Sequence, residues 1–175
     1  MDTLRAAMAR GGEGPLRRVI YTESHDEVAN GKARLPAAIW PGNGSSWFSR
    51  KRSMLGAVLV FTAPGIPMIL QGQEFLEDQW FHDQNPIDWA NSKVTAASSR
   101  SIATSFGCAA TGTTRRARFV EVTWLSTMST TTTTSLAYHR WNHGGPRDDV
   151  VVILNLANRS YDAYWVGLPR KGRGE

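Results

Sequence analysis

The stretch from Ser49 to Gln71 constrains the fold more than any other part of the sequence. Ser49 is expected to cap a helix over residues 50–61, whose second half is apolar on nearly all sides, as in a helix that packs against a sheet. Ala63-Pro64-Gly65 ends this helix, and residues 66–71 predict a short, fully buried strand. A long helix followed at once by a buried strand is typical of a parallel α/β sheet.

Two shorter elements precede this stretch. Residues 3–10 predict a helix that ends at a pair of glycines, and residues 17–22 predict a strand rich in β-branched and aromatic side chains. Residues 1–95 are therefore expected to form an α/β unit with two strands. Because two strand–helix units cannot close a sheet, the apolar face around residues 54–70 should lie uncovered, which predicts poor solubility or dependence on a partner.

Residues 136–175 have a β character. Residues 136–141, 150–156 and 161–166 predict three strands, and His143-Gly144-Gly145-Pro146 predicts a turn between the first two. This part is expected to be the start of an all-β domain, ending before a sandwich is complete.

Residues 96–135 fit neither pattern, because 18 of these 40 residues are serine or threonine. One interpretation is a polar linker. The other is a frame shift: read one base earlier, threonine codons preceded by G encode aspartate, and residues 97–111 then permit an amphipathic helix. We favour the second interpretation. Nucleotide codons that block the aspartate run or the helix would rule it out.

Composition narrows the class of protein. The net charge is +5, and residues 96–135, with four arginines and one acid, supply +3 of it, without any recognisable nucleic-acid motif elsewhere. No apolar run reaches membrane-spanning length, and the N-terminus does not resemble a signal peptide. Cys108 is the only cysteine, which agrees with a reducing cytoplasm. We expect a cytoplasmic protein without nucleic-acid or membrane partners.

The stretch of residues 21–31 places His, Asp and Glu side chains directly after the predicted strand of residues 17–22. Ser24-His25-Asp26 superficially suggests a catalytic triad, but neighbours on an extended chain point to opposite sides and should not form hydrogen bonds in series. The spacing of His25, Asp26 and Glu27 does not match a metal site, and no metal or cofactor is expected. By pattern alone, a strand-end loop in which Asp26 accepts bonds from turn amides explains the cluster equally well.

The residues from Val19 to Glu27 resemble the fourth conserved region of the α-amylase superfamily, and the Glu-Ser-His-Asp form is similar to 1,4-α-glucan branching enzymes in particular. With further stretches included, the resemblance covers about 130 of the 175 residues. They include residues 31–36, 50–53, 62–75, 88–89, 136–141 and 152–161. The resemblance implies the last two strand–helix units of a (β/α)8 TIM barrel in residues 1–95, a frame-shifted last barrel helix in 96–135, and the start of a C-terminal all-β sandwich domain in 136–175.

The family's chemistry is retaining glycosyl transfer through an oxocarbenium-like transition state. Carried onto this sequence, Asp26 is the carboxylate that stabilises the transition state, and His25 binds the same sugar. Glu74 lies just past the last barrel strand and is expected near the substrate. Glu23 and Glu27 have no role in the family and are expected to shape the loop. Trp80 and Trp89 are expected in the core, rather than stacked on glucose rings.

The family's nucleophile and general acid belong to earlier barrel strands, for which this sequence has no counterpart. The resemblance therefore implies a fragment of a branching-enzyme-like protein that is inactive alone, with an α-1,4-glucan such as glycogen, starch or maltooligosaccharide as partner. Two alternatives stay open. The chain is a non-catalytic glucan-binding or interaction module, or it is one chain of a split enzyme whose partner supplies the N-terminal part of the barrel.

Overall fold

A computed structural model describes residues 18–94, 96, 100, 102, 104, 121–123, 135–141 and 150–165. The chain divides into two compact units, one comprising Leu16–Ala110 and the other comprising Met1–Pro15 with Thr111–Glu175. The predicted helix of residues 3–10, the turn of residues 143–146 and most of the frame-shift segment lie outside the described residues.

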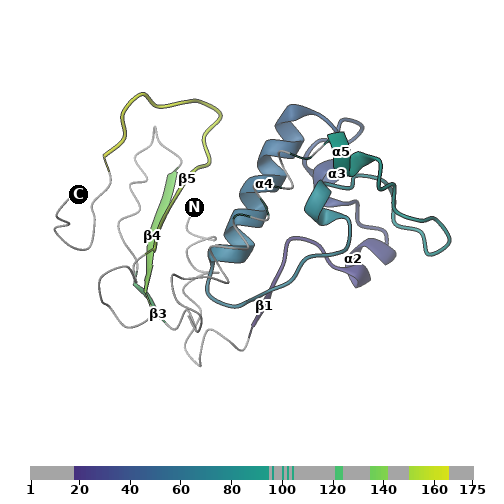
Figure 1. The fold of residues 1–175 in the computed structure, drawn as a ribbon, viewed down its shortest axis with the longest axis horizontal. Helices are drawn as coiled ribbons and strands as arrows, with labels where there is room; N and C mark the ends of the chain where they lie inside the picture. Colours follow the sequence, from purple (N-terminus) through teal and green to yellow (C-terminus); the bar gives the residue numbers. More distant parts are fainter. Residues whose placement is uncertain are drawn as a thin grey trace. The chain divides into compact units, whose positions relative to one another are not determined.

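The first unit is built on a parallel pair of strands. β1 (Val19–Ile20) pairs with β2 (Ile66–Pro67), and the connection between them contains α2 (His25–Ala29), α3 (Leu35–Ile39) and α4 (Trp47–Thr62). Ile66 N–H donates to the Arg18 carbonyl at 2.8 Å, and Met68 N–H donates to the Ile20 carbonyl at 2.9 Å. α3 packs against α4, the longest helix (Figure 1). Parallel pairing through a helical crossover is thus confirmed.

The helix α4 begins three residues earlier than predicted. Ser46 has a non-helical backbone, and its Oγ accepts the Ser49 N–H at 3.2 Å, so Ser46 is the cap and Ser49 lies inside the helix, fully buried. The predicted cap was wrong because Trp47 and Phe48 are also compatible with the first helical turn. The predicted stop is right, since Ala63 caps the C-terminus with its N–H on the Leu59 carbonyl at 2.8 Å.

Replacing Ser46 by alanine is expected to lower the free energy of unfolding by about 1 kcal/mol, because the substitution removes the side-chain acceptor at the helix start. The neighbouring exposed Ser45 has no capping role in the structure, so Ser45→Ala serves as the control and should change stability by less than about 0.5 kcal/mol. Urea unfolding measures both. Equal losses in the two variants would contradict the observed cap.

One face of α4 supplies the core of this unit. The buried side chains of Ala57 and Phe61 contact those of Leu76 and Ile102, and Met54 packs against this cluster. On another side, Gly56 lies so close to Thr22 that an added Cβ would come within 3.3 Å of the Thr22 methyl group. The helix therefore packs tightly beside the segment that follows β1.

β2 differs from its prediction. A fully buried strand was expected over residues 66–71, but the strand covers only Ile66–Pro67 and both residues are exposed. Among the described residues only β1 pairs with β2, so no further strand covers its other edge. Pro67 also lacks an N–H for the ladder. The chain then turns at Gly72 into the 3-10 helix η2 (Gln73–Phe75), and α5 (Asn91–Val94) follows a long loop.

The second unit contains an antiparallel sheet in the order β3-β4-β5. β3 (Glu121–Thr123) pairs with β4 (Ser135–Trp141), which pairs with β5 (Val150–Asn155). Leu136 and Tyr138 of β4 are fully buried and lie opposite Leu154 and Val152 of β5, so these four side chains share one face. Strands β4 and β5 confirm two of the three predicted strands, whereas β3 was not anticipated.

The predicted third strand at residues 161–166 is wrong for its described part, since residues 161–165 form no strand. The Asn155 side chain accepts the Ala157 N–H and donates to the Arg159 carbonyl, which closes a turn directly after β5. Tyr161 and Tyr164 then contact each other with ring centroids 5.7 Å apart. Side chains three residues apart cannot meet on an extended strand, because they point to opposite faces.

None of the helices in the described residues has the length and apolar character needed to cross a lipid bilayer.

Candidate functional site

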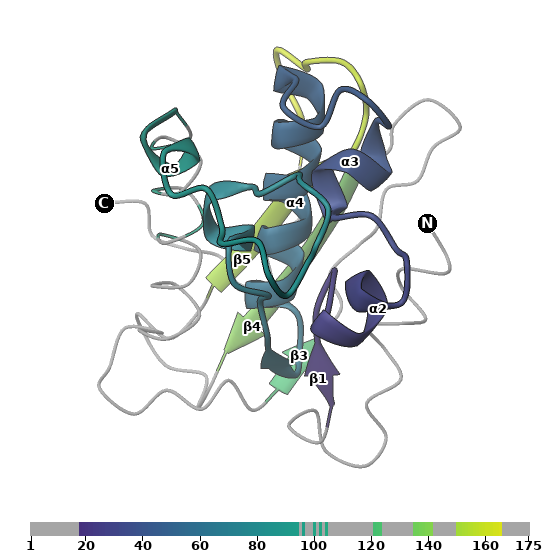
Figure 2. The same cartoon turned by 90° about the vertical axis from the view of Figure 1, so that its right-hand side faces the viewer.

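The polar cluster of residues 21–31 follows β1 directly, as predicted, and leads into α2 (Figure 2). Ser24 caps this helix with its Oγ on the Glu27 N–H at 3.3 Å. Residues 25–29 are helical rather than extended, so the premise used against hydrogen bonds between neighbouring residues was wrong. His25 and Asp26 do meet: His25 Nδ1 lies 3.3 Å from Asp26 Oδ1. The Ser24 hydroxyl is used by the helix cap, and the three residues form no triad.

His25 and Asp26 are both open to solvent. Their side chains are 64% and 92% exposed, respectively. The His25 ring also meets the edge of Phe81 at a centroid distance of 5.4 Å, with the two planes nearly perpendicular. The pair can thus contact a ligand from solvent, with the imidazole oriented by an aromatic neighbour on one side and a carboxylate on the other.

Glu74 lies in η2. No hydrogen bond or ion pair between described residues connects it to His25 or Asp26, and its Oε2 is buried without a hydrogen-bond partner there. The side chain that ties the two loops together is Gln73 instead. Its Nε2 donates to Thr22 Oγ1 at 2.5 Å, and its Oε1 accepts the Leu70 N–H at 3.1 Å.

A buried ion pair lies close in sequence to the exposed pair and connects the neighbouring loops. Glu23 Oε1 lies 3.0 Å from Arg34 Nε and 2.9 Å from a second guanidinium nitrogen, and the two side chains are only 4% and 3% exposed. Glu23 Oε2 accepts the Leu35 N–H, and Arg34 also donates to the Gln71 carbonyl at 3.0 Å. These bonds connect the loop after β1 to the start of α3 and to the turn before η2. The expectation that Glu23 shapes the loop agrees with this geometry.

Burial raises the pKa of the Glu23 carboxyl above its ordinary value, and the nearby Glu77 adds to the rise. The Arg34 guanidinium and the Leu35 amide oppose it, because both favour the charged form. Glu27, by contrast, is paired at the surface: Lys32 Nζ lies 2.6 Å from its Oε1, and this hydrogen bond raises the pKa of Lys32.

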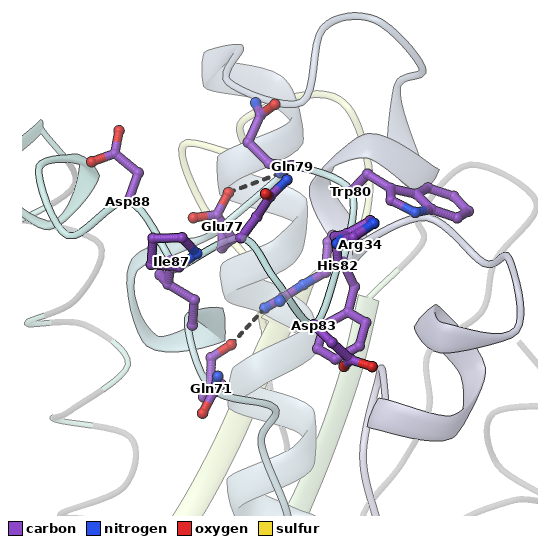
Figure 3. A pocket seen from close by; sticks show the side chains of 12 residues that line it. Arg34, Gln71, Glu77, Gln79, Trp80, His82, Asp83, Ile87 and Asp88 are labelled. Carbon is purple, nitrogen blue, oxygen red and sulfur yellow. Dashed lines mark hydrogen bonds between the residues drawn. The ribbon is translucent and has the colours of Figure 1, made fainter.

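The loop that follows η2 encloses a pocket of about 430 Å³ (Figure 3). Its lining includes Arg34, Glu77 and the loop residues from Gln79 to Asp83. Glu77 is buried, and its Oε1 accepts the N–H groups of Asp78 and Gln79 at 3.1 and 2.9 Å. Figure 3 shows the Glu77–Gln79 bond and the bond from Arg34 to Gln71 beside this pocket.

The tryptophans of this region are not core residues. Trp80 is 59% exposed, and Trp89 is exposed although its ring lies 5.2 Å from that of Phe75. The expectation that both pack in the core was therefore wrong. Loop residues 78–90 are largely polar and hold these rings at the surface.

The sequence indicated His25 and Asp26, which meet in the structure, but gave no role to Arg34 and Glu77. Arg34 is one of twenty basic residues, and its pairing with Glu23 depends on a turn that brings residues 23 and 34 together. The one available signal was the acid at the strand end, Glu23, which needed a buried cation. Among the described residues, no group of three or more histidine, cysteine, aspartate or glutamate side chains is placed to hold a metal ion.

Comparison of this chain with protein-family models, curated proteins and solved structures finds no match.

Proposed function

We propose that this chain is part of an α-glucan-processing enzyme of the branching-enzyme type and that it binds α-1,4-glucan through Asp26 and His25. The observation that carries the proposal is the exposed His25–Asp26 pair at the carboxyl end of a parallel strand, where α/β barrels hold their substrate-binding side chains. The carboxylate accepts hydrogen bonds from sugar hydroxyls, and the imidazole donates one.

The contacts that hold this pair in place also support a role in glucan binding. Glu23 and Arg34 link the backbone before α2 to the backbone after it, and Phe81 contacts the His25 ring. A site held in this way loses little conformational entropy when a ligand binds. In the complete family reaction, Asp26 would favour the distorted sugar ring while a nucleophile and a general acid from other barrel strands carry out bond exchange. Glu74 is proposed as a neighbouring support of this site.

The alternative functions use the same residues. A binding module needs only the Asp26–His25 contacts, whereas a split enzyme also needs a second chain with the nucleophile and acid. We propose that the isolated chain binds glucan without transferring or hydrolysing it, and that it acts in the cytoplasm. An upstream reading frame that encodes the two missing motifs would favour the split enzyme.

Titration calorimetry with maltoheptaose tests the proposal. Asp26→Asn is expected to raise the dissociation constant about tenfold or more, because a hydrogen bond to a charged group contributes roughly 1.5–3 kcal/mol. Asp162→Asn makes the same chemical change at an exposed position in the other unit and should leave the dissociation constant unaltered. If the chain releases no heat with the oligosaccharide, or if both variants lose affinity equally, the proposed site is wrong.

A further inference from the structure

Opposite charges are segregated along the sequence of the first unit. Residues 28–52 contain five lysine or arginine residues and no acid, residues 53–73 are uncharged, and residues 74–92 contain five acids and no lysine or arginine. Two of the five cations are neutralised within the chain, because they pair with Glu23 and Glu27. The other three are consecutive and lie far along the sequence from any carboxylate.

Arg50, Lys51 and Arg52 form a cationic patch at the start of α4. Among the described residues, no carboxylate forms an ion pair with any of the three. Lys51 Nζ lies 6.0 Å from the centroid of the Trp47 ring, and Arg52 Cζ lies 4.5 Å from that of Phe48. Such contacts hold a cation at the surface without neutralising it. The cationic patch therefore keeps its full positive charge.

The acidic loop, residues 78–88, carries the opposite charge. Asp83 and Asp88, both drawn in Figure 3, are exposed, and Asp78 is half-buried. Asp78 and Asp88 accept hydrogen bonds from neutral amide groups of nearby residues. In the part of the chain that the structure describes, no cation pairs with these three carboxylates. Three unneutralised acids of this loop thus match the three unneutralised cations of α4.

The cationic patch and the acidic loop border each other. Gly44, which precedes α4, lies so close to the loop that an added Cβ would come within 2.8 Å of Asp78 Cβ. The acidic loop therefore begins beside the end of α4 that carries the cationic patch. A two-fold axis at this boundary would bring the cationic patch of each copy opposite the acidic loop of the other, so that one closed dimer contains the same contact twice.

We propose that the chain forms a two-fold dimer in which the cationic patch of each copy contacts the acidic loop of the other. Each surface lacks a charge partner within its own chain and finds one in the second copy. Trp47 beside the cationic patch and Trp80 in the acidic loop are 72% and 59% exposed, and they add apolar area to the same contact. This association is separate from the proposed glucan binding and does not depend on it.

Charge complementarity favours a second copy over other anionic partners. A nucleic acid or an anionic membrane would suit the cationic patch alone, but the adjoining acidic loop would repel either of them. A neutral glucan would leave all six charges without a partner. A second copy satisfies both surfaces at once.

Analytical ultracentrifugation of the intact chain tests the dimer by charge reversal. Lys51→Glu/Arg52→Glu and Asp83→Lys/Asp88→Lys should each be monomeric, because like charges then face each other. An equimolar mixture of the two variants should form dimers again, since each reversed surface meets its opposite. The dissociation constant of the wild-type dimer should rise roughly tenfold between about 50 and about 500 mM salt, because salt screens exposed charges.

A matched control separates the contact from net charge. Lys93→Glu/Arg100→Glu makes the same change in net charge as the α4 variant at two exposed positions outside both surfaces, and it should stay dimeric. Circular dichroism verifies that all variants are folded. A wild type that is monomeric at low salt refutes the dimer, as does a mixture that does not associate. If a monomeric wild type instead binds poly(U) RNA or phosphatidylserine vesicles, another anionic partner occupies the cationic patch and the dimer is likewise refuted.

Discussion

Replacement of Arg34 by methionine is expected to lower the free energy of unfolding by about 3–5 kcal/mol at neutral pH. Methionine keeps much of the apolar stem but leaves the Glu23 carboxylate buried without its cation, and loss of one partner of a buried ion pair has an effect of this size. The Gln71 carbonyl loses a donor as well. Urea unfolding followed by circular dichroism at pH 7 measures the change.

The surface pair Lys32–Glu27 provides the control. Its two charged groups are closer, at 2.6 Å, but Lys32 is 69% exposed, so Lys32→Met should change stability far less than Arg34→Met does. Similar losses in the two variants would show that burial does not govern the Arg34 effect.

The Arg34 variant should also respond to pH in a defined direction. Arg34 lowers the pKa of Glu23, so its removal lets burial raise that pKa further above the ordinary value of 4.5. A carboxyl with a raised folded-state pKa binds its proton more readily in the folded chain, and its contribution to stability is lost as the pH rises through that pKa. The deficit of Arg34→Met should therefore shrink as the pH falls from 7 towards 5. A constant deficit across this range would contradict the assignment to Glu23.

Replacement of Gly65 by alanine is expected to lower the free energy of unfolding by about 2–4 kcal/mol. Gly65 has a φ of +153°, which other residues rarely adopt, and an added Cβ would lie 2.3 Å from Ile20 Cδ1 and 3.0 Å from the Arg18 carbonyl oxygen. That carbonyl accepts the Ile66 N–H of the parallel ladder. Relief of the clash must move β1 or β2 and so disturb the strand that leads to His25.

Gly42→Ala isolates the backbone contribution, because Gly42 has a φ of +78° but nothing within 4 Å of an added Cβ. Its expected loss is about 1 kcal/mol, from the left-handed conformation alone. Thermal unfolding compares the two variants, and maltoheptaose titration shows whether only Gly65→Ala also weakens glucan binding. Equal thermal losses would mean that Ile20 yields freely and that the close approach is unimportant.

The sequence allowed prediction of those elements that local patterns define. An apolar helix with a Pro-Gly stop predicted α4 and placed its end at residue 61, one residue before the observed end, and β-branched runs predicted β4 and β5. The parallel pairing followed from the order of elements. Predictions failed at Ser46, whose side chain caps α4, and after β5, where the Asn155 side chain closes a turn and residues 161–165 form no strand. The pairing of β3 was hidden in a threonine-rich segment without a strand pattern.

The candidate site was predictable only in part. His25 and Asp26 were proposed from their place after a strand together with the resemblance to a known family, whereas the buried pair of Glu23 and Arg34 depends on how the chain folds back over eleven residues. The pocket depends on the bonds of Glu77 to the amides of its own loop. No periodic pattern in a sequence encodes such contacts. The exposure of Trp80 follows from its place in a polar loop, which outweighs the usual preference of indole for the interior.

The parallel ladder between β1 and β2 also determines the order in which this unit can fold. Its strands lie at opposite ends of a segment that contains three helices, so its first hydrogen bond requires closure of a long loop, with the entropy loss that this entails. α4 forms from contacts between near neighbours and gains its stability by packing. We therefore expect α4 to become structured before β1 and β2 meet, and the strand end that presents His25 to reach its final position last, when the crossover closes.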